Sequence, residues 1–210
     1  GGIMTLKLNG SSSGSVSIDA PASTTGGADI TFKLPVADGT SGQALTTNAS
    51  GQLAFAGTGL FSSYAILADQ KSAGTGGGAS SANAWTTSVL NTEIADPDSI
   101  VSISSNQFTL GAGNYLIKWV KTFFNSHRVT TRLYDVTNST VKQYGMNSIA
   151  LGSSGEQVEC FGIARVTPTG STAYKFEYYV DNADSDGLGA DTPDDEGVNI
   201  YSLVEIYKES

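Results

Sequence analysis

The acidic segment of residues 181–196 is the stretch of the chain best suited to bind a metal ion. It reads DNADSDGLGADTPDDE, and hard cations such as Ca²⁺ prefer oxygen ligands. Placing Gly187 at the glycine of an EF-hand loop puts Pro193 where a bidentate glutamate is required, which excludes that loop. Two alternatives remain for this segment: a looser calcium site or a solvated acidic turn. Its ligands would be Asp184, Asp186 and Asp191.

The single histidine, His127, limits imidazole chemistry to one position. Ser126, His127 and Asp135 could suggest a nucleophile, a base and an orienting acid. Adjacent residues on a strand point to opposite faces, however, so Ser126 cannot meet His127 in the usual way. We therefore expect no catalytic triad.

Cys160 is the only cysteine, which excludes an intramolecular disulfide. A reactive thiol needs basic neighbours, and only Arg165 is close in sequence. We expect Cys160 to be a small hydrophobic residue of the core.

Paired carboxylates could cleave glycans if they stood about 5–10 Å apart across a cleft. The chain offers Glu93, Asp96, Asp98, Glu156 and Glu159, and nothing marks any two of them as a pair. It also lacks the sustained repeat of a long solenoid enzyme. The glycine-rich turns lack the Gly-Lys-Ser/Thr ending of a phosphate loop. We predict a non-enzymatic protein without a cofactor. A glycan-cleaving enzyme is the less favoured alternative.

Aromatic rings can stack on sugars, and Tyr64, Tyr144, Tyr179 and Tyr201 are available for this. Tyrosine at strand spacing is more typical of a core or an interface. The sequence therefore assigns no glycan site to these residues.

Composition narrows the classes of partner. The 210 residues include 39% hydrophobic and only 15% charged residues, and the formal net charge is -9. Nucleic acid is a poor partner for such a chain, because affinity for a polyphosphate comes largely from neutralising its charge. No apolar run approaches the length of a membrane span, so we expect no membrane insertion.

Alternating apolar and polar residues predict strands throughout the C-terminal part of the chain. Intervening Gly, Asn, Asp and Ser turns favour a β-sandwich or jelly roll rather than helices. The expected strands are residues 64–68, 85–94, 101–103, 108–110, 115–124, 129–136, 158–166, 174–180 and 198–207.

Two of these strands are apolar on both faces. In residues 174–180 one face is apolar and Lys175 and Glu177 occupy the other, whereas residues 115–124 and 198–207 have no polar face. Such strands need a second partner, either another subunit or a thick single-chain sandwich. We predict a subunit interface at Tyr115, Ile117, Trp119, Tyr201, Leu203 and Tyr207.

The N-terminal part, residues 4–58, has short alternating runs such as Leu6 to Leu8 and Ile30 to Leu34. About fifty residues with so few strand signals rarely close a core alone. We expect this β module to associate with identical chains, and the head domain to occupy residues 59–210.

The phrase NQFTLGAGNYLI, within residues 91–134, resembles the central strands of trimeric jelly-roll heads of bacteriophage tail-fibre proteins. These heads are related in fold to tumour necrosis factor and complement globular domains. Arg132 to Thr137 similarly resembles the strand form R-L-x-x-V-T of those heads. The resemblance implies a homotrimer that binds rather than reacts. It also implies that His127, Arg128 or Arg132 helps to build the interior or the subunit contacts.

The N-terminal module resembles a segment found near the start of many phage structural proteins. The shared elements are Ala20-Pro21, Leu34-Pro35 and the G-x-L-x-F form of residues 51–55. The resemblance implies attachment to other virion proteins through this module.

Together these patterns predict an all-β chain: a small N-terminal β module followed by a trimeric jelly-roll head. The expected role is a tail-fibre or receptor-binding appendage that adheres to a bacterial surface glycan or protein. The alternative is a capsid decoration protein, of the cement or head-fibre kind, that stabilises the phage head. The chain lacks a signal-peptide pattern at its start. We expect synthesis in the bacterial host cytoplasm and a final location on the virion surface.

Overall fold

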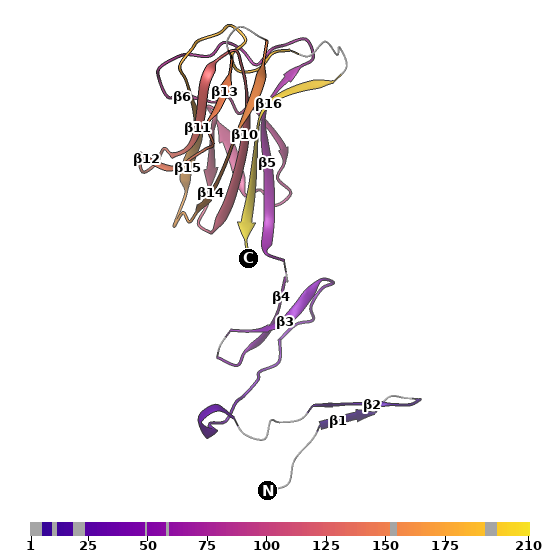
Figure 1. Cartoon of the computed structure of the whole chain (residues 1–210). Helices are drawn as coiled ribbons and strands as arrows, with labels where there is room; N and C mark the ends of the chain where they lie inside the picture. The colour runs from indigo at the N-terminus through magenta and orange to yellow at the C-terminus, as the bar shows by residue number, and fades with distance from the viewer. Residues whose placement is uncertain are drawn as a thin grey trace. The chain divides into compact units, whose positions relative to one another are not determined.

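The computed structural model describes residues 6–9, 12–18, 24–48, 50–57, 59–151, 155–191 and 197–210. The chain divides into two compact units, residues 1–58 and residues 59–210, which we call unit 1 and the head unit. Each is considered by itself, and Figure 1 labels their strands. Among the described residues, no helix is long and apolar enough to cross a membrane.

The head unit contains two antiparallel sheets. Sheet I has five strands in the order β14-β10-β16-β5-β7, and β10, β16 and β5 are seen side by side in Figure 1. Their bounds are Gln157–Val166 (β14), Tyr115–Phe124 (β10), Val198–Glu209 (β16), Phe61–Ser72 (β5) and Thr92–Ala95 (β7).

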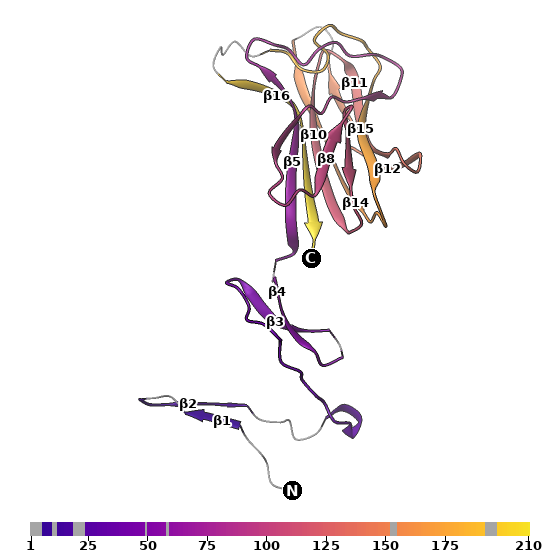
Figure 2. The ribbon, with the colours of Figure 1, turned by 180° about the vertical axis from the view of Figure 1, so that it is seen from behind.

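Sheet II has seven strands, five of them in the order β12-β11-β15-β9-β8. The short strand β13 pairs with β11, and β6 pairs with β15. In the view from behind, Figure 2 labels β8, β11, β12 and β15 of this sheet. The bounds are Thr140–Tyr144 (β12), His127–Asp135 (β11), Thr172–Val180 (β15), Gln107–Leu110 (β9), Val101–Ser104 (β8), Ser148–Ala150 (β13) and Thr86–Thr87 (β6).

The chain passes repeatedly from one sheet to the other. β9 lies in sheet II, β10 in sheet I, β11 in sheet II, β14 in sheet I, β15 in sheet II and β16 in sheet I. Successive strands of this set thus lie in opposite sheets instead of pairing, which is the arrangement of a jelly roll. The predicted all-β jelly-roll fold is confirmed.

The core fills the space between the inner faces of the two sheets. Alternate residues of β15 are buried as predicted, from Tyr174 to Val180, because a half-buried strand places every second side chain on the core side. The larger core cluster joins Tyr174 and Phe176 to residues of β5, β10 and β16, including Leu67, Ile117 and Ile206, whereas Tyr178 and Val180 belong to a smaller cluster.

Trp119 links the two sheets. Its indole N–H on β10 donates to the Thr131 hydroxyl on β11 at 2.9 Å, and both residues are buried. Gly162 on β14 lies directly opposite Trp119, and a Cβ at that position would overlap the indole ring. The Trp119 ring therefore occupies the space that any other residue at position 162 would need.

Two charged residues are enclosed between the sheets. Lys121 and Asp69 are both fully buried, and the Lys121 ammonium donates to the Ser202 hydroxyl at 3.2 Å. Burial lowers the pKa of Lys121 to about 8, although the nearby Asp69 charge opposes this shift. Burial also raises the pKa of Asp69. Asp69 also pairs with Lys71 at 3.9 Å, and the charges of Lys121 and Lys71 both act to lower its pKa. The opposite charges of Lys121 and Asp69 thus partly offset the cost of burying each of them.

Most strands of the head unit follow the predicted pattern, and β10 has the predicted bounds. The expected strand over residues 85–94 is instead two short strands, β6 and β7, one in each sheet. β12 and β13 were not predicted, because their few residues show no clear alternation.

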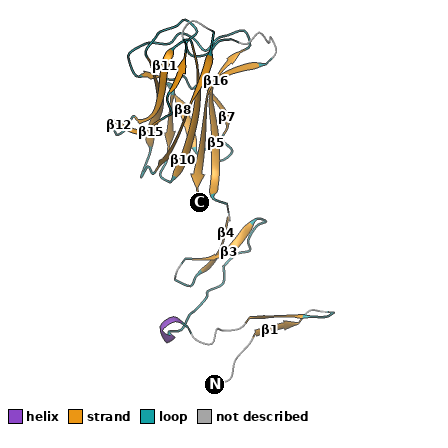
Figure 3. Cartoon of the chain, viewed as in Figure 1, coloured by secondary structure: helices purple, strands orange, loops and turns teal. Residues whose placement is uncertain are grey.

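Among its described residues, unit 1 forms two pairs of antiparallel strands. β1 (Leu6–Asn9) pairs with β2 (Ser15–Ile18), and β3 (Gln43–Thr47) pairs with β4 (Leu53–Gly57). Figure 3 shows the short helical turn of this unit, Thr25–Gly27, in purple. The expected strand at Ile30 to Leu34 is wrong: only Lys33 forms a bridge, to Gln52. Ala20-Pro21 lies outside the described residues.

Candidate interaction surface

The outer face of sheet I carries exposed apolar side chains, among them Phe161 and Ile163. On β10, alternation points Leu116, Val120 and Phe124 outward, where they are half-buried. Tyr115, Ile117 and Trp119 point inward and are at most 3% exposed. A side chain enclosed by its own chain cannot reach another subunit. The predicted interface is therefore wrong for these three residues, and the opposite face of the same strand is the available one.

The outward residues of neighbouring strands are in register and form continuous rows. Phe161 of β14 pairs with Val120, which in turn pairs with Leu203 of β16. In the next row Ile163 of β14 pairs with Lys118. Phe161 and Ile163 are 49% and 55% exposed, so the apolar face reaches the β14 edge of the sheet.

Leu203 and Tyr207, which were predicted to lie at an interface, are both half-buried on β16. Leu203 pairs with Val120 and Tyr207 pairs with Leu116, both on the outer face of β10. These two residues therefore lie on the apolar outer face, as an interface role requires.

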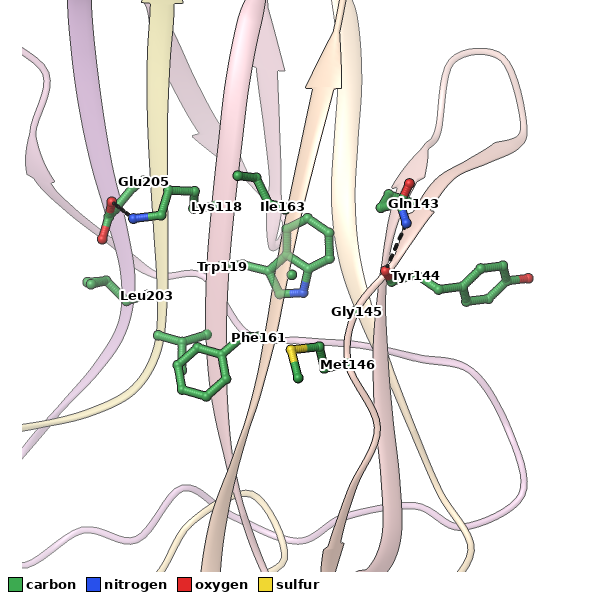
Figure 4. A pocket seen from close by; sticks show the side chains of 12 residues that line it. Lys118, Trp119, Gln143, Tyr144, Gly145, Met146, Phe161, Ile163, Leu203 and Glu205 are labelled. Atoms are coloured by element: carbon green, nitrogen blue, oxygen red, sulfur yellow. Dashed lines mark hydrogen bonds and ion pairs between the residues drawn. The ribbon is translucent and has the colours of Figure 1, made fainter.

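A pocket of about 580 Å³ opens on this face, and Figure 4 shows it from close by. Trp119 and Gly162 form part of its wall, and Phe161, Ile163 and Leu203 supply its apolar lining. Pockets of this size and composition commonly take an apolar group.

The connection between β12 and β13 completes the pocket by crossing from sheet II to the edge of sheet I. Gly145 donates its N–H to the Thr131 carbonyl at 2.8 Å, and Met146 donates to the Phe161 carbonyl at 2.7 Å. A Cβ at Gly145 would approach the Phe161 carbonyl within 2.9 Å, so this close crossing requires glycine. Met146 lies beside Phe161 in Figure 4 and is itself exposed.

The Lys118–Glu205 ion pair lies within the apolar face. The Lys118 ammonium is 2.9 Å from the Glu205 carboxylate, which also accepts a 2.7 Å hydrogen bond from the Tyr207 hydroxyl. The hydrogen bonds from Tyr207 and Lys118 lower the pKa of Glu205. The pair fixes polar groups among apolar ones, which would set the register of a partner placed on this face.

Tyr201 differs from its neighbours on β16 because the pairing with β5 shifts between Ile200 and Ser202. It is 4% exposed, and its hydroxyl donates to the Thr75 carbonyl at 2.8 Å. Its ring also lies against Gly189, where a Cβ would overlap it. Tyr201 thus anchors two loops of its own chain, and its predicted interface role is wrong.

The three predicted calcium ligands are engaged separately. Asp184 accepts the Asp186 N–H at 2.9 Å, while Asp191 accepts the Asn199 amide at 2.7 Å. Over the described part of the chain, no three acidic, histidine or cysteine side chains are grouped so that they could hold a metal ion. Residues 192–196 of the acidic segment lie outside the description.

The residues of the imagined triad lie in three different environments. Buried Ser126 donates to the Gly187 carbonyl at 3.0 Å, and Asp135 accepts the Asn138 N–H at 2.9 Å. His127 instead pairs with Asp181 at 2.9 Å.

The basic residues singled out by resemblance do not lie in the core. The His127 side chain is 43% exposed, Arg128 is exposed, and Arg132 lies on the outer face of sheet II. The interior role considered for these three residues is therefore wrong.

The other carboxylates considered for glycan cleavage are dispersed. Asp96 accepts backbone N–H groups of Ile100 and Val101, and Asp98 accepts the Ser63 hydroxyl. Glu93 and Glu159 lie on the two opposite edge strands of sheet I.

Cys160 is fully buried and lies in the smaller core cluster with Phe123 and Tyr178. Burial raises the pKa of its thiol to about 12. The thiolate is therefore absent near neutral pH, which confirms Cys160 as a core residue.

No protein-family model and no curated protein matches the chain. Among solved structures it is similar to the globular domain of zebrafish complement 1qA protein, at 12% identity over 70% of this chain and 96% of that one, with a TM-score of 0.45. It is also similar to Eiger TNF from S. frugiperda, at 12% identity over 70% and 92% of the two chains, with a TM-score of 0.48. PRD1 vertex protein P5 matches at 16% identity over 72% and 100%, with a TM-score of 0.43. At TM-scores below 0.5, the strand order described above remains the basis for the jelly-roll assignment.

Proposed function

We propose that this chain is a non-enzymatic structural protein of a bacteriophage particle that works as a homotrimer. In this proposal unit 1 attaches the protein to other virion proteins, and the jelly-roll head is exposed for adhesion to the host surface. The favoured role is a tail-fibre or receptor-binding appendage.

The observation that carries the proposal is apolar surface that a single chain leaves uncovered. In unit 1, none of the residues whose side chains the structure describes is buried. Large apolar side chains stay exposed there, including Leu34 at 77% and Phe32 at 62%. Transferring one such side chain from water into a contact contributes about 1.5–3 kcal/mol. The exposed set comprises Leu6, Leu8, Ile30, Phe32, Leu34, Val36, Leu45 and Phe55.

The head unit adds a second uncovered surface, the apolar outer face of sheet I. Its exposed residues Phe161, Ile163 and Met146 are contiguous, whereas scattered single apolar residues would need no explanation. Identical chains supply both surfaces at once, so contacts through unit 1 and through sheet I would reinforce one another.

Three copies agree with the resemblance of residues 91–134 to trimeric heads. Three identical sites held together would convert weak adhesion to a repetitive cell surface into strong attachment, because later binding events occur at high effective concentration.

Imaging of intact particles tests the location. Antibody against the head unit, seen by electron microscopy, should label the tail. Uniform label over the capsid would favour a decoration protein, and absence from particles would overturn the virion role.

Deleting residues 1–58 tests the division of labour between the two units. The head unit has its own two core clusters, so it should remain folded. Incorporation into particles should be lost. A truncated protein that still enters particles would contradict the attachment role of unit 1.

The absence of catalysis is tested by incubating the full chain with host capsule or lipopolysaccharide. No new reducing ends should form. Oligosaccharide release that disappears on changing one acidic residue would overturn the proposal.

A further inference from the structure

The outer face of sheet II carries a cluster of aromatic rings outside the core, of which Tyr144 also lines the pocket of sheet I. Trp85 lies at its centre, with ring centroids 5.7 Å from Tyr179 and 5.9 Å from Tyr144. Tyr134 lies nearby on β11, and all four rings are at least partly exposed. We call Trp85, Tyr134, Tyr144 and Tyr179 the aromatic platform.

Charged groups beneath the rings hold the platform in place. The Arg132 guanidinium lies 4.1 Å from the centre of the Trp85 ring and 5.2 Å from that of Tyr134. Arg132 and Lys175 both pair with Glu177, at 2.6 and 2.7 Å. Glu177 was expected to face water, but it is only 4% exposed under this cover. Such paired and stacked support fixes the rings before any ligand arrives.

A pocket of about 530 Å³ adjoins the platform at Tyr179. Arg128, Asn147 and Asp181 contribute polar groups to its lining, and Ile149 contributes an apolar one. Asp181 is fixed by His127 and by the Arg128 N–H at 2.8 Å. The guanidinium of Arg128 is exposed and forms no ion pair within the described residues. Its donors are therefore available to a ligand.

This combination fits one class of ligand. A sugar ring offers C–H faces that pack on flat aromatic rings and hydroxyls that bind planar polar side chains such as Asn, Asp and Arg. The pocket volume lies within the range of about 300–1,000 Å³ that small ligands occupy. Nucleic-acid bases also stack on aromatic rings, but a chain of net charge -9 repels their phosphates.

We propose that the aromatic platform and the adjoining pocket bind an oligosaccharide, with a sugar ring against Trp85 and Tyr179 and its hydroxyls on Asn147, Asp181 and Arg128. This inference rests on the proposed adhesive role and names the chemistry of its partner. Of the platform residues only Tyr144 also lines the pocket of sheet I, so a subunit contact over sheet I leaves Trp85, Tyr134 and Tyr179 open.

The two tryptophans of the chain provide a built-in control. Trp85 lies on the platform, whereas Trp119 is 3% exposed and contributes to the pocket of sheet I. Each gives one indole N–H signal in a ¹H–¹⁵N NMR spectrum of the full chain. Glucose, galactose, mannose, N-acetylglucosamine, N-acetylgalactosamine and glucuronate would be added up to on the order of 100 mM, since single rings bind weakly.

At least one of the six sugars should shift the Trp85 signal and leave the Trp119 signal unchanged. Trp85→Ala, followed on backbone signals of residues 128–130 and 147–149, should weaken that binding about tenfold or more, because a stacking ring is lost. Tyr179→Phe keeps the ring and should weaken it less than Tyr179→Ala. Phe161→Ala, on the other outer face, should leave it unchanged.

The inference would be overturned if none of the six sugars moved the Trp85 signal, or if only Trp119 responded. Loss of host-cell adhesion in Trp85→Ala without any sugar binding by the parent chain would point to a protein receptor and also overturn it. Both results would leave the proposed structural role intact. Absence of the protein from phage particles would remove that role instead.

Discussion

The two outer faces of the head sandwich share one core but differ in chemistry. Sheet I presents mainly apolar side chains around the Lys118–Glu205 ion pair, whereas sheet II presents tyrosine and tryptophan rings over a buried charge network. Because side chains on a strand alternate between its two faces, the outward residues can change without disturbing the inward ones. One jelly roll can therefore serve two kinds of partner.

Two isoleucines make the contrast direct. Ile163 on sheet I is 55% exposed and Ile149 on sheet II is 54% exposed. Ile163 lies among Phe161, Leu203 and Met146, whereas Ile149 lies beside Arg128 and Asp181. Equal exposure of the same residue type thus occurs in two settings, one suited to a second subunit and the other to a polar ligand.

The largest effect is expected from replacing one of these isoleucines by arginine. Ile163→Arg places an unpaired charge in the proposed subunit contact and should raise the dissociation constant of the assembly by about a thousandfold or more. Ile149→Arg has the same chemistry on the other face and should leave the assembly intact. Sedimentation velocity over a dilution series measures both. Equal dissociation by the two variants would show that the faces do not differ as proposed.

The next largest effect is expected from substitutions in the core between the two sheets. Lys121→Met leaves the buried Asp69 carboxylate with Lys71, 3.9 Å away, as its cationic partner, and should lower the free energy of unfolding by about 3 kcal/mol. Asp69→Leu should cost a similar amount, while the double variant should return close to the parent value. Urea unfolding of the head unit measures this cycle. Additive losses would contradict the coupling of the two charges.

Lys121 also predicts a pH dependence. The folded state lowers the pKa of its ammonium from 10.5 to about 8, so the unfolded chain binds more protons between these values. Stability from this group therefore rises as the pH rises from about 8 towards 10.5. Lys121→Met should lose that rise. An unchanged alkaline profile in the variant would assign the rise to other groups.

A smaller effect is expected beneath the aromatic platform. Glu177→Gln removes the charge that pairs with Arg132 and Lys175, and should lower the free energy of unfolding by about 2 kcal/mol. The indole signal of Trp85 should move, because Arg132 is no longer held against it, while that of Trp119 should not. A Trp85 signal unchanged in Glu177→Gln would show that the network does not position the platform.

The smallest effect is expected at the exposed ion pair of sheet I. Hydrogen bonds from Tyr207 and Lys118 lower the pKa of Glu205 from 4.5, so its contribution is present above that pH and is lost as the pH falls through the lowered pKa. Glu205→Gln should flatten this acid limb and change stability near neutral pH by at most about 1 kcal/mol in the dissociated chain. A larger change in stability that occurs only in the assembled protein would support the assignment of this face as a subunit contact.

Much of the fold could be predicted from the sequence, because the strands of the head unit alternate clearly. β10 and β14 were expected nearly to the residue, and the buried face of β15 was assigned correctly. In β10 both faces are apolar, so alternation alone could not tell which set points inward. The interface was therefore placed on Tyr115, Ile117 and Trp119 when Leu116 and Val120 face out.

The residues that form the two surfaces were harder to predict because they meet only through long-range pairing. Phe161 and Ile163 do alternate with buried residues of β14, a signal that could have found them. Met146 lies in a connection with no periodicity, and Trp85 lies just before the short strand β6, so only the fold brings them to their pocket and platform. Glu177 was expected to face water because it is charged and lies on an outer face. Its sequence neighbours give no sign that another segment covers it.

The central claim is that identical chains cover the apolar surfaces of unit 1 and sheet I. Light scattering of the full chain at micromolar concentration tests it directly. The expected mass is that of three chains of 21.7 kDa each, and it should fall to one chain in Ile163→Arg. A stable monomer of the parent chain would contradict the account.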